Sequence, residues 1–194
     1  MSNTPDPDRI AAVLQFAQDA EQLKDTLRTG ITRRGRQEST AEHSWRLCLI
    51  ALLFARELPE VDLLRLLKLC LVHDLGEAIS GDVPATQQHT EPDRALRERS
   101  DLLTLCAPLP PDLRDELVGL WDEYAAGQTA EALAAKGFDK IETMLQHLLG
   151  LNPPDFDYAF NLSYGKGYTD RHPLLAAIRD NVDRQTRERL RSLM

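Results

Sequence analysis

The sequence has little of what several large classes of protein require. Its 194 residues include only three cysteines, Cys48, Cys70 and Cys106, and no CxxC pair. This usage argues against a zinc ribbon or a thioredoxin-like site and favours reduced core thiols in a cytoplasmic protein. Every apolar run is broken before the roughly eighteen residues that a membrane span needs, and the first residues do not resemble a signal peptide.

Positive charge is also scarce. The chain has 31 acidic against 23 basic side chains, which gives a formal net charge of −8. Such a balance argues against binding to nucleic acid polymers or to anionic membranes, because both favour basic surfaces. One local exception is a group of four arginines within nine residues, which would suit a small anionic substrate: Arg28, Arg33, Arg34 and Arg36.

Strand signals and glycine-rich loops are missing as well. No run alternates at period two, no repeat is visible, and no glycine-rich loop follows a strand, which excludes P-loop and dinucleotide-binding folds. Helical periodicity is present almost throughout, so the sequence predicts an all-α bundle of about seven helices. The predicted helices cover residues 8–27, 39–59, 61–80, 94–105, 112–126, 129–149 and 173–194.

A chain of this length favours one domain, spanning residues 1–194. Residues 28–37, with two glycines and no apolar period, are expected to form a loop, and Ser39 with Glu42 has the spacing of a capping box for the helix that follows. We expect residues 151–194 to pack on a core formed by residues 20–150. In the aromatic segment, residues 156–168, core closure is favoured over base stacking for four side chains: Tyr158, Phe160, Tyr164 and Tyr168.

The segment LVHDLGEAISGDVP, residues 71–84, concentrates titratable groups. His73 and Asp74 lie near the end of a very apolar predicted helix, where burying an imidazole beside a carboxylate is costly unless something compensates them. A divalent cation would do so, because both groups are good metal ligands. Glu77 lies on the same helical face, and Asp82 follows just beyond the helix end. Taken alone, a His-Asp pair is more often a chance occurrence than a metal site.

Two further segments add potential ligands. In ESTAEHSW, His43 lies one turn into a predicted helix, and in FDKIE, Asp139 lies beside an apolar stripe. Two histidines and two aspartates from three helices can form an N2O2 set, with water completing the coordination sphere. The other histidines, His89, His147 and His172, have no partners at ligand spacing, so we predict one metal ion and not two.

The segments LRTG, ESTAEHSW, HDLGEAISGD and DKIE, in this order, resemble the HD-domain phosphohydrolases, and specifically the small bacterial and archaeal branch that includes 5′-deoxynucleotidases. The resemblance covers roughly residues 20–150. It implies a helical hydrolase that releases phosphate from nucleoside 5′-monophosphates through metal-activated water. It also implies one divalent transition metal ion (Mn, Co, Fe, Ni or Zn), with the ligands His43, His73, Asp74 and Asp139.

The resemblance assigns roles to other side chains too. Glu77 and Asp82 would orient water and move protons, and Arg28 would bind the phosphate. Arg36 or Arg33 could join Arg28 there, although the resemblance supports Arg28 alone. Thr29 stands where the characterised deoxynucleotidases carry a Trp near the sugar, so strict selectivity for deoxyribose is not implied. A homodimer is implied as well.

Other interpretations stay open. The same site could act on another signalling nucleotide, or the chain could be a non-catalytic nucleotide-binding module with a structural metal. Glu77 and Asp82 count against the second interpretation, because a structural site does not need carboxylates beyond its ligands. Lys140 follows a predicted ligand, and a phosphate contact and an exposed helix position are equally compatible with the sequence.

Overall fold

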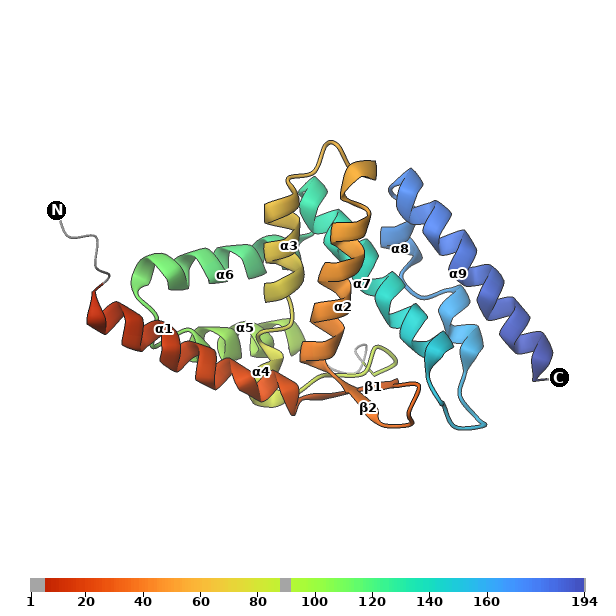
Figure 1. The fold of residues 1–194 in the computed structure, drawn as a ribbon, viewed down its shortest axis with the longest axis horizontal. Coiled ribbons are helices and arrows are strands. Elements are labelled where there is room, and N and C mark those ends of the chain that lie inside the picture. Colours follow the sequence, from red (N-terminus) through yellow and green to blue (C-terminus); the bar gives the residue numbers. More distant parts are fainter. Residues whose placement is uncertain (1–5, 88–91, 194) are drawn as a thin grey trace.

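Helices dominate the computed structural model, which describes residues 6–87 and 92–193, and the all-α prediction is confirmed (Figure 1). Seven of the described helices have ten or more residues, as predicted. The α-helices are α1 (Pro7–Asp19), α2 (Thr40–Leu53), α3 (Leu63–Val72), α4 (Glu77–Ser80), α5 (Arg94–Leu105), α6 (Pro111–Ala126), α7 (Ala130–Leu149), α8 (Lys166–Thr169) and α9 (Pro173–Ser192). The remaining elements are the strands β1 (Leu27–Ile31) and β2 (Gln37–Ser39) and the 3₁₀ helices η1 (Ala20–Lys24), η2 (Ala55–Glu57) and η4 (Tyr158–Leu162).

Most of the long helices begin at signals that the sequence shows. Ser39 and Glu42 form the predicted capping box of α2, because each side chain accepts a hydrogen bond from the backbone N–H of the other. Thr129 caps α7 by accepting from a backbone N–H of the first turn. Pro111 and Pro173 occupy the first turns of α6 and α9, where a missing N–H costs no helical hydrogen bond.

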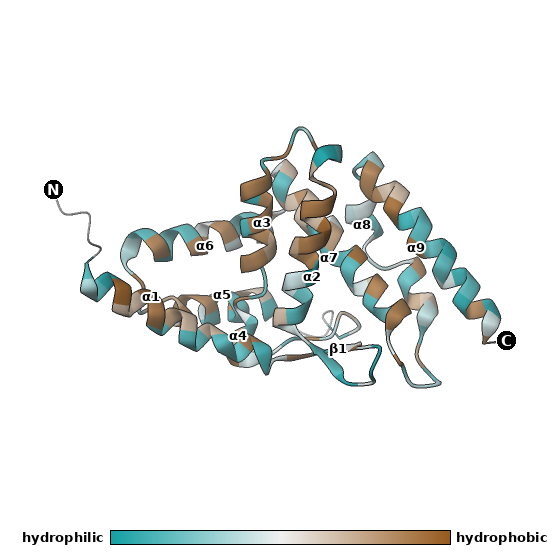
Figure 2. Ribbon diagram, in the orientation of Figure 1, coloured by the Kyte–Doolittle hydropathy of each residue, from teal (hydrophilic) through white to brown (hydrophobic). Residues whose placement is uncertain are grey.

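The core of the molecule forms around α7, which contacts α2, α3, α6 and α9 (Figure 1). Leu47 of α2, Leu69 of α3 and Phe138 and Ile141 of α7 are fully buried. Figure 2 shows α3 and much of α2 as hydrophobic, whereas α9 is mostly hydrophilic in the same view. A helix that is apolar on most sides must be covered by its neighbours, so α2, α3 and α7 share one interior.

The predicted helix over residues 61–80 is interrupted, and this part of the prediction is wrong. Residues 73–76 form a turn between α3 and α4, in which the N–H of Glu77 bonds the carbonyl of Asp74, three residues earlier, at 3.0 Å. Such a tight turn places side chains at positions i and i+3 above one another. Asp74 and Glu77 therefore come out on the same side, as a continuous helix would also have placed them.

The chain turns before α4 because α4 packs so closely against α5 that their backbones are in contact. A Cβ on Gly76 would lie 2.4 Å from the carbonyl oxygen of Glu98, so only glycine fits there. Gly81 then ends α4 with a φ of 84°, a conformation that side chains disfavour. The two glycines of the HDLGEAISGD segment thus decide how α4 is seated and where Asp82 emerges.

The segment predicted as a loop, residues 28–37, belongs to a β-hairpin. The strands β1 and β2 pair antiparallel, with Ile31 opposite Gln37, and Gly35 turns the chain with a φ of 82°. The strands are short and polar, so they carry no alternating pattern in the sequence. They are held by packing on α7, where the side-chain amide of Gln146 donates to the carbonyl of Ile31.

The aromatic segment is tied to α9 by one buried arginine. The guanidinium of Arg179 donates to the carbonyl oxygens of Asn161 and Tyr164, at 2.6 and 2.5 Å, and pairs with Asp183 at 2.7 Å. The first two hydrogen bonds satisfy backbone carbonyl groups that lie outside the long helices. Arg179 therefore holds η4 and α8 against the bundle.

Two further features concern membrane-spanning helices and the cysteines. No helix within residues 6–87 and 92–193 is long and apolar enough to cross a membrane. Cys48, Cys70 and Cys106 are all unpaired, and the last two are buried.

Candidate metal centre and cavity

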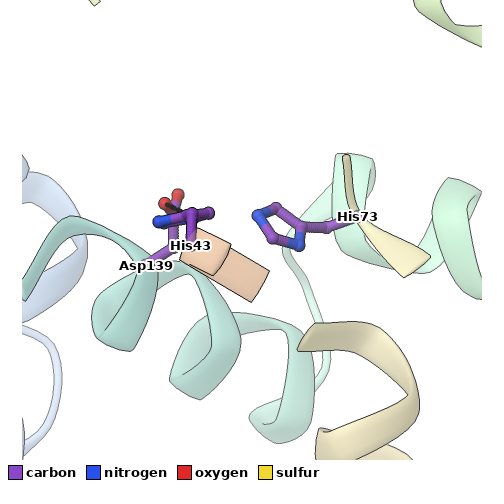
Figure 3. Close-up of side chains that lie close together, drawn as sticks. All are labelled: His43, His73 and Asp139. Carbon is purple, nitrogen blue, oxygen red and sulfur yellow. Dashed lines mark ion pairs between the residues drawn. The ribbon is translucent and has the colours of Figure 1, made fainter. Parts of the chain in front are cut away.

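Three side chains from three parts of the chain meet in the interior. His43 comes from α2, His73 directly follows α3, and Asp139 comes from α7, and one ligand atom of each lies within 4.8 Å of the others. The Nε2 of His43 lies 3.3 Å from Oδ1 of Asp139. Figure 3 shows the imidazole of His73 facing the other two side chains. The structure thus brings three of the four predicted ligands into one buried cluster.

The Nδ1 atom of each of these histidines is already engaged. In His43 it contacts a carboxylate oxygen of Glu142, and in His73 it lies 2.9 Å from the carbonyl oxygen of Cys70. A carbonyl only accepts, so Nδ1 of His73 carries a proton, and Nε2 is the nitrogen that faces the cluster. Both Nε2 atoms are buried and form no hydrogen bond with any residue that the structure describes. Such orientation by a second partner is typical of metal-binding histidines.

Asp74 joins the same cluster. Its Oδ2 lies 3.0 Å from Nε2 of His73 and 3.8 Å from Nε2 of His43. Nη1 of Arg28 donates to the same oxygen at 3.2 Å. All four predicted metal ligands therefore lie close to one another.

Asp139 has two hydrogen-bond partners on its Oδ2 atom. The hydroxyl of Tyr124 donates to it at 2.9 Å and the ammonium group of Lys140 at 2.7 Å. Lys140 is thus mostly buried beside a predicted ligand, and the exposed helix position is excluded for it. Oδ1 is left facing His43, which orients the carboxylate toward the cluster.

Carboxyl groups outnumber cationic groups around the cluster. Burial, together with the charges of Asp74 and Asp82, raises the pKa of Glu77 to about 9, and burial also raises the pKa of Asp82. The carboxyl groups are Asp74, Glu77, Asp82 and Asp139, and the groups that can carry positive charge beside them are Arg28, Lys140 and His43. Imidazole and carboxylate groups are good ligands for a divalent cation, so the residues present fit the predicted ion.

A metal ion at this cluster would compete with a proton for His43. Burial lowers its pKa, but Glu142 and Asp139 more than offset this effect and raise the pKa to about 10. A metal binds imidazole only at a deprotonated nitrogen. A cation at this cluster would therefore displace a proton from His43.

A cavity of about 450 Å³ opens beside the cluster. This volume lies within the range of roughly 300–1,000 Å³ that is usual for small-molecule sites. Arg28, Thr29, Glu77 and Asp82, which the sequence predicts as site residues, all line it together with Asp74. The guanidinium of Arg28 thus faces both the cavity and the carboxylates.

Arg36 is not brought together with the other predicted site residues. Its exposed guanidinium forms two hydrogen bonds with the carboxylate of Glu42, the capping-box residue of α2. The hairpin explains the contrast with Arg28: β1 carries Arg28 against α7, whereas Arg36 lies just before β2 and points to the start of α2. A phosphate-binding role for Arg36 has no support in this geometry.

Sequence reasoning missed two residues that hold the cluster. Glu142 lies one helical turn after Asp139 in DKIE, so its spacing contained a signal for a place on the same face of α7. Tyr124 gave no such signal, because α6 reaches Asp139 only through tertiary packing. The hydroxyl of Thr40 also donates to a carboxylate oxygen of Glu77, at 3.1 Å.

The remaining histidines differ from one another. His172 is at the surface and lies 2.9 Å from a carboxylate oxygen of Glu60. His147 is buried and lines the cavity, although no role was predicted for it. His89, which entered the argument for a single metal, lies outside the described residues.

The aromatic segment does not simply close the core. Tyr158 is buried, but Phe160, Tyr164 and Tyr168 line the cavity, as does Phe156. The expectation of core closure holds for Tyr158, and Tyr164 also packs against the core, whereas for Phe160 and Tyr168 the structure shows a place in the cavity lining. Packing of the segment on α7, held by Arg179, decides this difference.

The chain belongs to the HD domain family, whose model matches residues 20–179. The helical fold and the cluster of His and Asp side chains agree with this assignment, and the family relationship predicted from the sequence is confirmed. The match also extends past residue 150, so the aromatic segment lies within the family's domain.

The chain is 35% identical over 137 residues to the protein 5′-deoxynucleotidase HDDC2 of Homo sapiens and 37% identical over 136 residues to that of Bos taurus. These alignments cover 70% and 69% of this chain and 66% and 65% of the relatives, so the chain spans about two thirds of their length. Its fold is similar to a crystal structure described as a predicted metal-dependent phosphohydrolase from Magnetospirillum magnetotacticum, with a TM-score of 0.74 and 30% identity. That similarity covers 93% of this chain and 96% of the other.

Proposed function

We propose that this protein is a metal-dependent phosphohydrolase that releases inorganic phosphate from nucleoside 5′-monophosphates, deoxynucleotides in particular. The observation that carries the proposal is the pair of buried Nε2 atoms without hydrogen bonds, set among carboxyl groups at the edge of a cavity that also holds Arg28. The relatives named 5′-deoxynucleotidase support the substrate class.

One divalent transition ion would be held by His43, His73, Asp74 and Asp139. When bound, such an ion lowers the pKa of a water molecule towards about 7 and neutralises phosphate charge. Imidazole and carboxylate ligands suit Mn, Co, Fe, Ni and Zn, and nothing in the donor set selects among them.

Arg28 is suited to bind the phosphate. Its guanidinium is mostly buried at the cavity edge and is positioned by Asp74 and by the hydroxyl of Thr143. Burial lowers its pKa, but the surrounding carboxylates more than offset this effect and raise it, so the group stays charged. A planar guanidinium can donate two parallel hydrogen bonds to phosphate oxygens, which orients as well as binds the substrate.

Glu77 and Asp82 are suited to hold and move protons. Both line the cavity beside Asp74. The pKa of Glu77 is raised to about 9, so this group holds a proton near neutral pH that is available for transfer, and burial raises the pKa of Asp82 as well. The hydroxyl of Thr40 fixes one oxygen of Glu77, and the same carboxyl group forms a side-chain hydrogen bond with Asp82. Nη1 of Arg28 lies 3.9 Å from Oδ1 of Asp82, so a phosphate bound by Arg28 would lie close to these carboxyl groups.

The test is phosphate release from deoxy- and ribonucleoside 5′-monophosphates, with cyclic nucleotides included, at fixed concentrations of Mn, Co, Fe, Ni and Zn. We expect release from monophosphates with at least one metal, its loss with a chelator and its return when that metal is restored. Turnover confined to cyclic nucleotides would favour the signalling-nucleotide alternative. An absence of release with every metal and substrate would overturn the proposal.

Glu77→Gln separates proton transfer from metal binding. Glutamine keeps the shape of the side chain but cannot take up a proton, so turnover should fall about 10² to 10⁴-fold. Metal content, measured by elemental analysis, should stay at the wild-type level. A variant with normal metal and a near-normal rate would show that Glu77 has no catalytic role.

We also propose a cytoplasmic location for the protein. Its three cysteines are unpaired and two are buried in the core, which supports a compartment where thiols stay reduced.

A further inference from the structure

The cavity continues beyond the cluster along one face of α7. Asp139, Thr143, Gln146 and His147 recur at helical spacing, and all four line it. With a rise of about 1.5 Å per residue, His147 lies about 12 Å beyond Asp139 along the helix axis. A nucleoside monophosphate with its phosphate at the cluster would extend its base in this direction.

Aromatic rings surround His147 at this end of the cavity. Phe156 meets the imidazole edge-on with ring centroids 5.0 Å apart, and Phe160 lies 6.4 Å away. Phe160 in turn stacks on Tyr164 at 4.8 Å. Such flat apolar surfaces favour contact with another flat ring, whichever hydrogen-bond donors and acceptors that ring carries.

The hydrogen bonds of His147 determine which of its nitrogens can accept. Nδ1 lies 2.7 Å from Oδ1 of Asn161, and the amide group of Asn161 is oriented because its Nδ2 donates to the carbonyl of Met144. An amide oxygen only accepts, so the proton of His147 is on Nδ1. Burial lowers the pKa of His147, which keeps the ring neutral. Nε2 is then an acceptor, and it has no partner among residues 6–87 and 92–193.

Neighbouring polar groups leave acceptors at this end as well. Gln146 uses one side-chain N–H on the carbonyl of Ile31, which leaves its oxygen and its second N–H available. The carboxylate of Asp157 accepts from two backbone N–H groups of η4 and can offer only further lone pairs. His147 and Asp157 therefore present acceptors alone beside the aromatic rings, and Gln146 presents an acceptor and one N–H.

We propose that His147 recognises the base of the substrate by accepting, at Nε2, a hydrogen bond from an exocyclic amino group. Phe156 and Phe160 contact the ring of that base. This inference rests on the proposed function, which supplies a nucleotide as the substrate. Cytosine and adenine carry an amino group where uracil and hypoxanthine carry an oxygen. An oxygen opposite Nε2 would set acceptor against acceptor, so amino-bearing bases should be preferred.

The test compares two substrate pairs that differ at this group, dCMP with dUMP and dAMP with dIMP. Both dissociation constants and kcat/KM are measured on the metal-loaded enzyme. We expect the amino-bearing member of at least one pair to be favoured about tenfold, as one hydrogen bond gives. Wild-type ratios near one in both pairs, or a preference for the oxygen-bearing members, would overturn the inference.

Two substitutions of His147 test whether this residue causes the preference for amino-bearing bases. His147→Phe keeps a flat ring but removes the acceptor, so the preference should fall to near one. His147→Gln returns an acceptor oxygen at similar reach and should restore part of it. Metal content and the melting temperature of the metal-loaded proteins, compared among all three, show whether the fold and the metal end of the cavity are intact. A preference that survives in folded His147→Phe would assign recognition to another group.

The two proposals can fail separately. Phosphate release without any amino preference would leave the proposed function standing and remove the role of His147. An amino preference in the dissociation constants without release of phosphate would support the base site and overturn the hydrolase.

Discussion

The imidazoles of His43 and His73 are the most informative side chains of the molecule. Each is engaged at Nδ1, and each has a buried Nε2 with no hydrogen bond within the described residues. A buried polar atom without a hydrogen bond costs about 1–3 kcal/mol, and the carboxylates of Asp74 and Asp139 lie close to these two atoms without forming one. Metal binding would remove this cost, so the fold as well as the activity should respond to the ion.

We expect wild-type protein to bind one divalent transition ion per chain and to melt at a higher temperature when it is loaded. A ligand at about 100 times its dissociation constant adds about 2.7 kcal/mol of stability. His73→Ala should lose both the ion and the shift. Elemental analysis and thermal unfolding measure the two effects.

The matched control for this experiment is His172→Ala, because His172 is at the surface and pairs with Glu60. It should keep the ion and the shift in melting temperature. Full metal content in His73→Ala would contradict the assignment of the cluster.

Thr29 bears on the choice between deoxyribose and ribose. It lines the cavity beside Arg28, and its small side chain carries a hydroxyl at the position where the resemblance described above would imply a flat indole. A 2′-hydroxyl should therefore be tolerated, and the ratio of kcat/KM for matched deoxy- and ribonucleoside 5′-monophosphates should stay below about 100. A larger ratio would mean that another side chain excludes the ribose.

At the scale of elements, the contact between α4 and α5 positions Glu77 and Asp82. Gly76→Ala would put a Cβ 2.4 Å from the carbonyl oxygen of Glu98, and backbone atoms must move to relieve this clash. We expect the variant to lose about 1–3 kcal/mol of unfolding free energy, as overpacked sites do. Turnover should fall as well, because α4 carries Glu77.

Gly119→Ala is the control for this substitution, since its Cβ would meet nothing within 4 Å in the middle of α6. Alanine there should be neutral or should stabilise the protein by up to about 1 kcal/mol. Urea unfolding of both variants makes the comparison. Equal stability of the two would show that α4 and α5 can separate freely.

The whole molecule leaves an apolar stripe on α2 exposed. Trp45 and Leu53 are 66% and 70% exposed, and Leu49 and Leu52 lie on the same side of the helix. We expect a homodimer that covers this stripe, with light scattering at micromolar concentration giving twice the chain mass. Trp45→Glu should shift the mass to that of a monomer, because a buried unpaired charge opposes association.

Leu96→Glu tests whether any exposed leucine would have the same effect, because Leu96 is 70% exposed on α5, away from the stripe. It should leave the mass unchanged. A monodisperse monomer mass for the wild type would refute the dimer.

The sequence by itself determined the helices and the composition of the cluster. Capping residues, helical periodicity and prolines at first turns are local properties, and they placed seven long helices. The grouping of His43, His73 and Asp139 was also accessible, because polar groups on apolar helices are costly unless they meet. Their order along the chain was enough to indicate the family.

Only the tertiary structure decided how other side chains reach the site. The turn before α4 depends on the close contact of Gly76 with the backbone carbonyl of Glu98 in α5. Arg28 points inward because the hairpin packs on α7, whereas Arg36 pairs with Glu42 at the surface. The approach of Tyr124 to Asp139 has the same origin. These contacts join residues far apart in the sequence, and no local pattern specifies which surfaces will meet. For that reason the ligands were predictable, whereas the shape of the cavity around them was not.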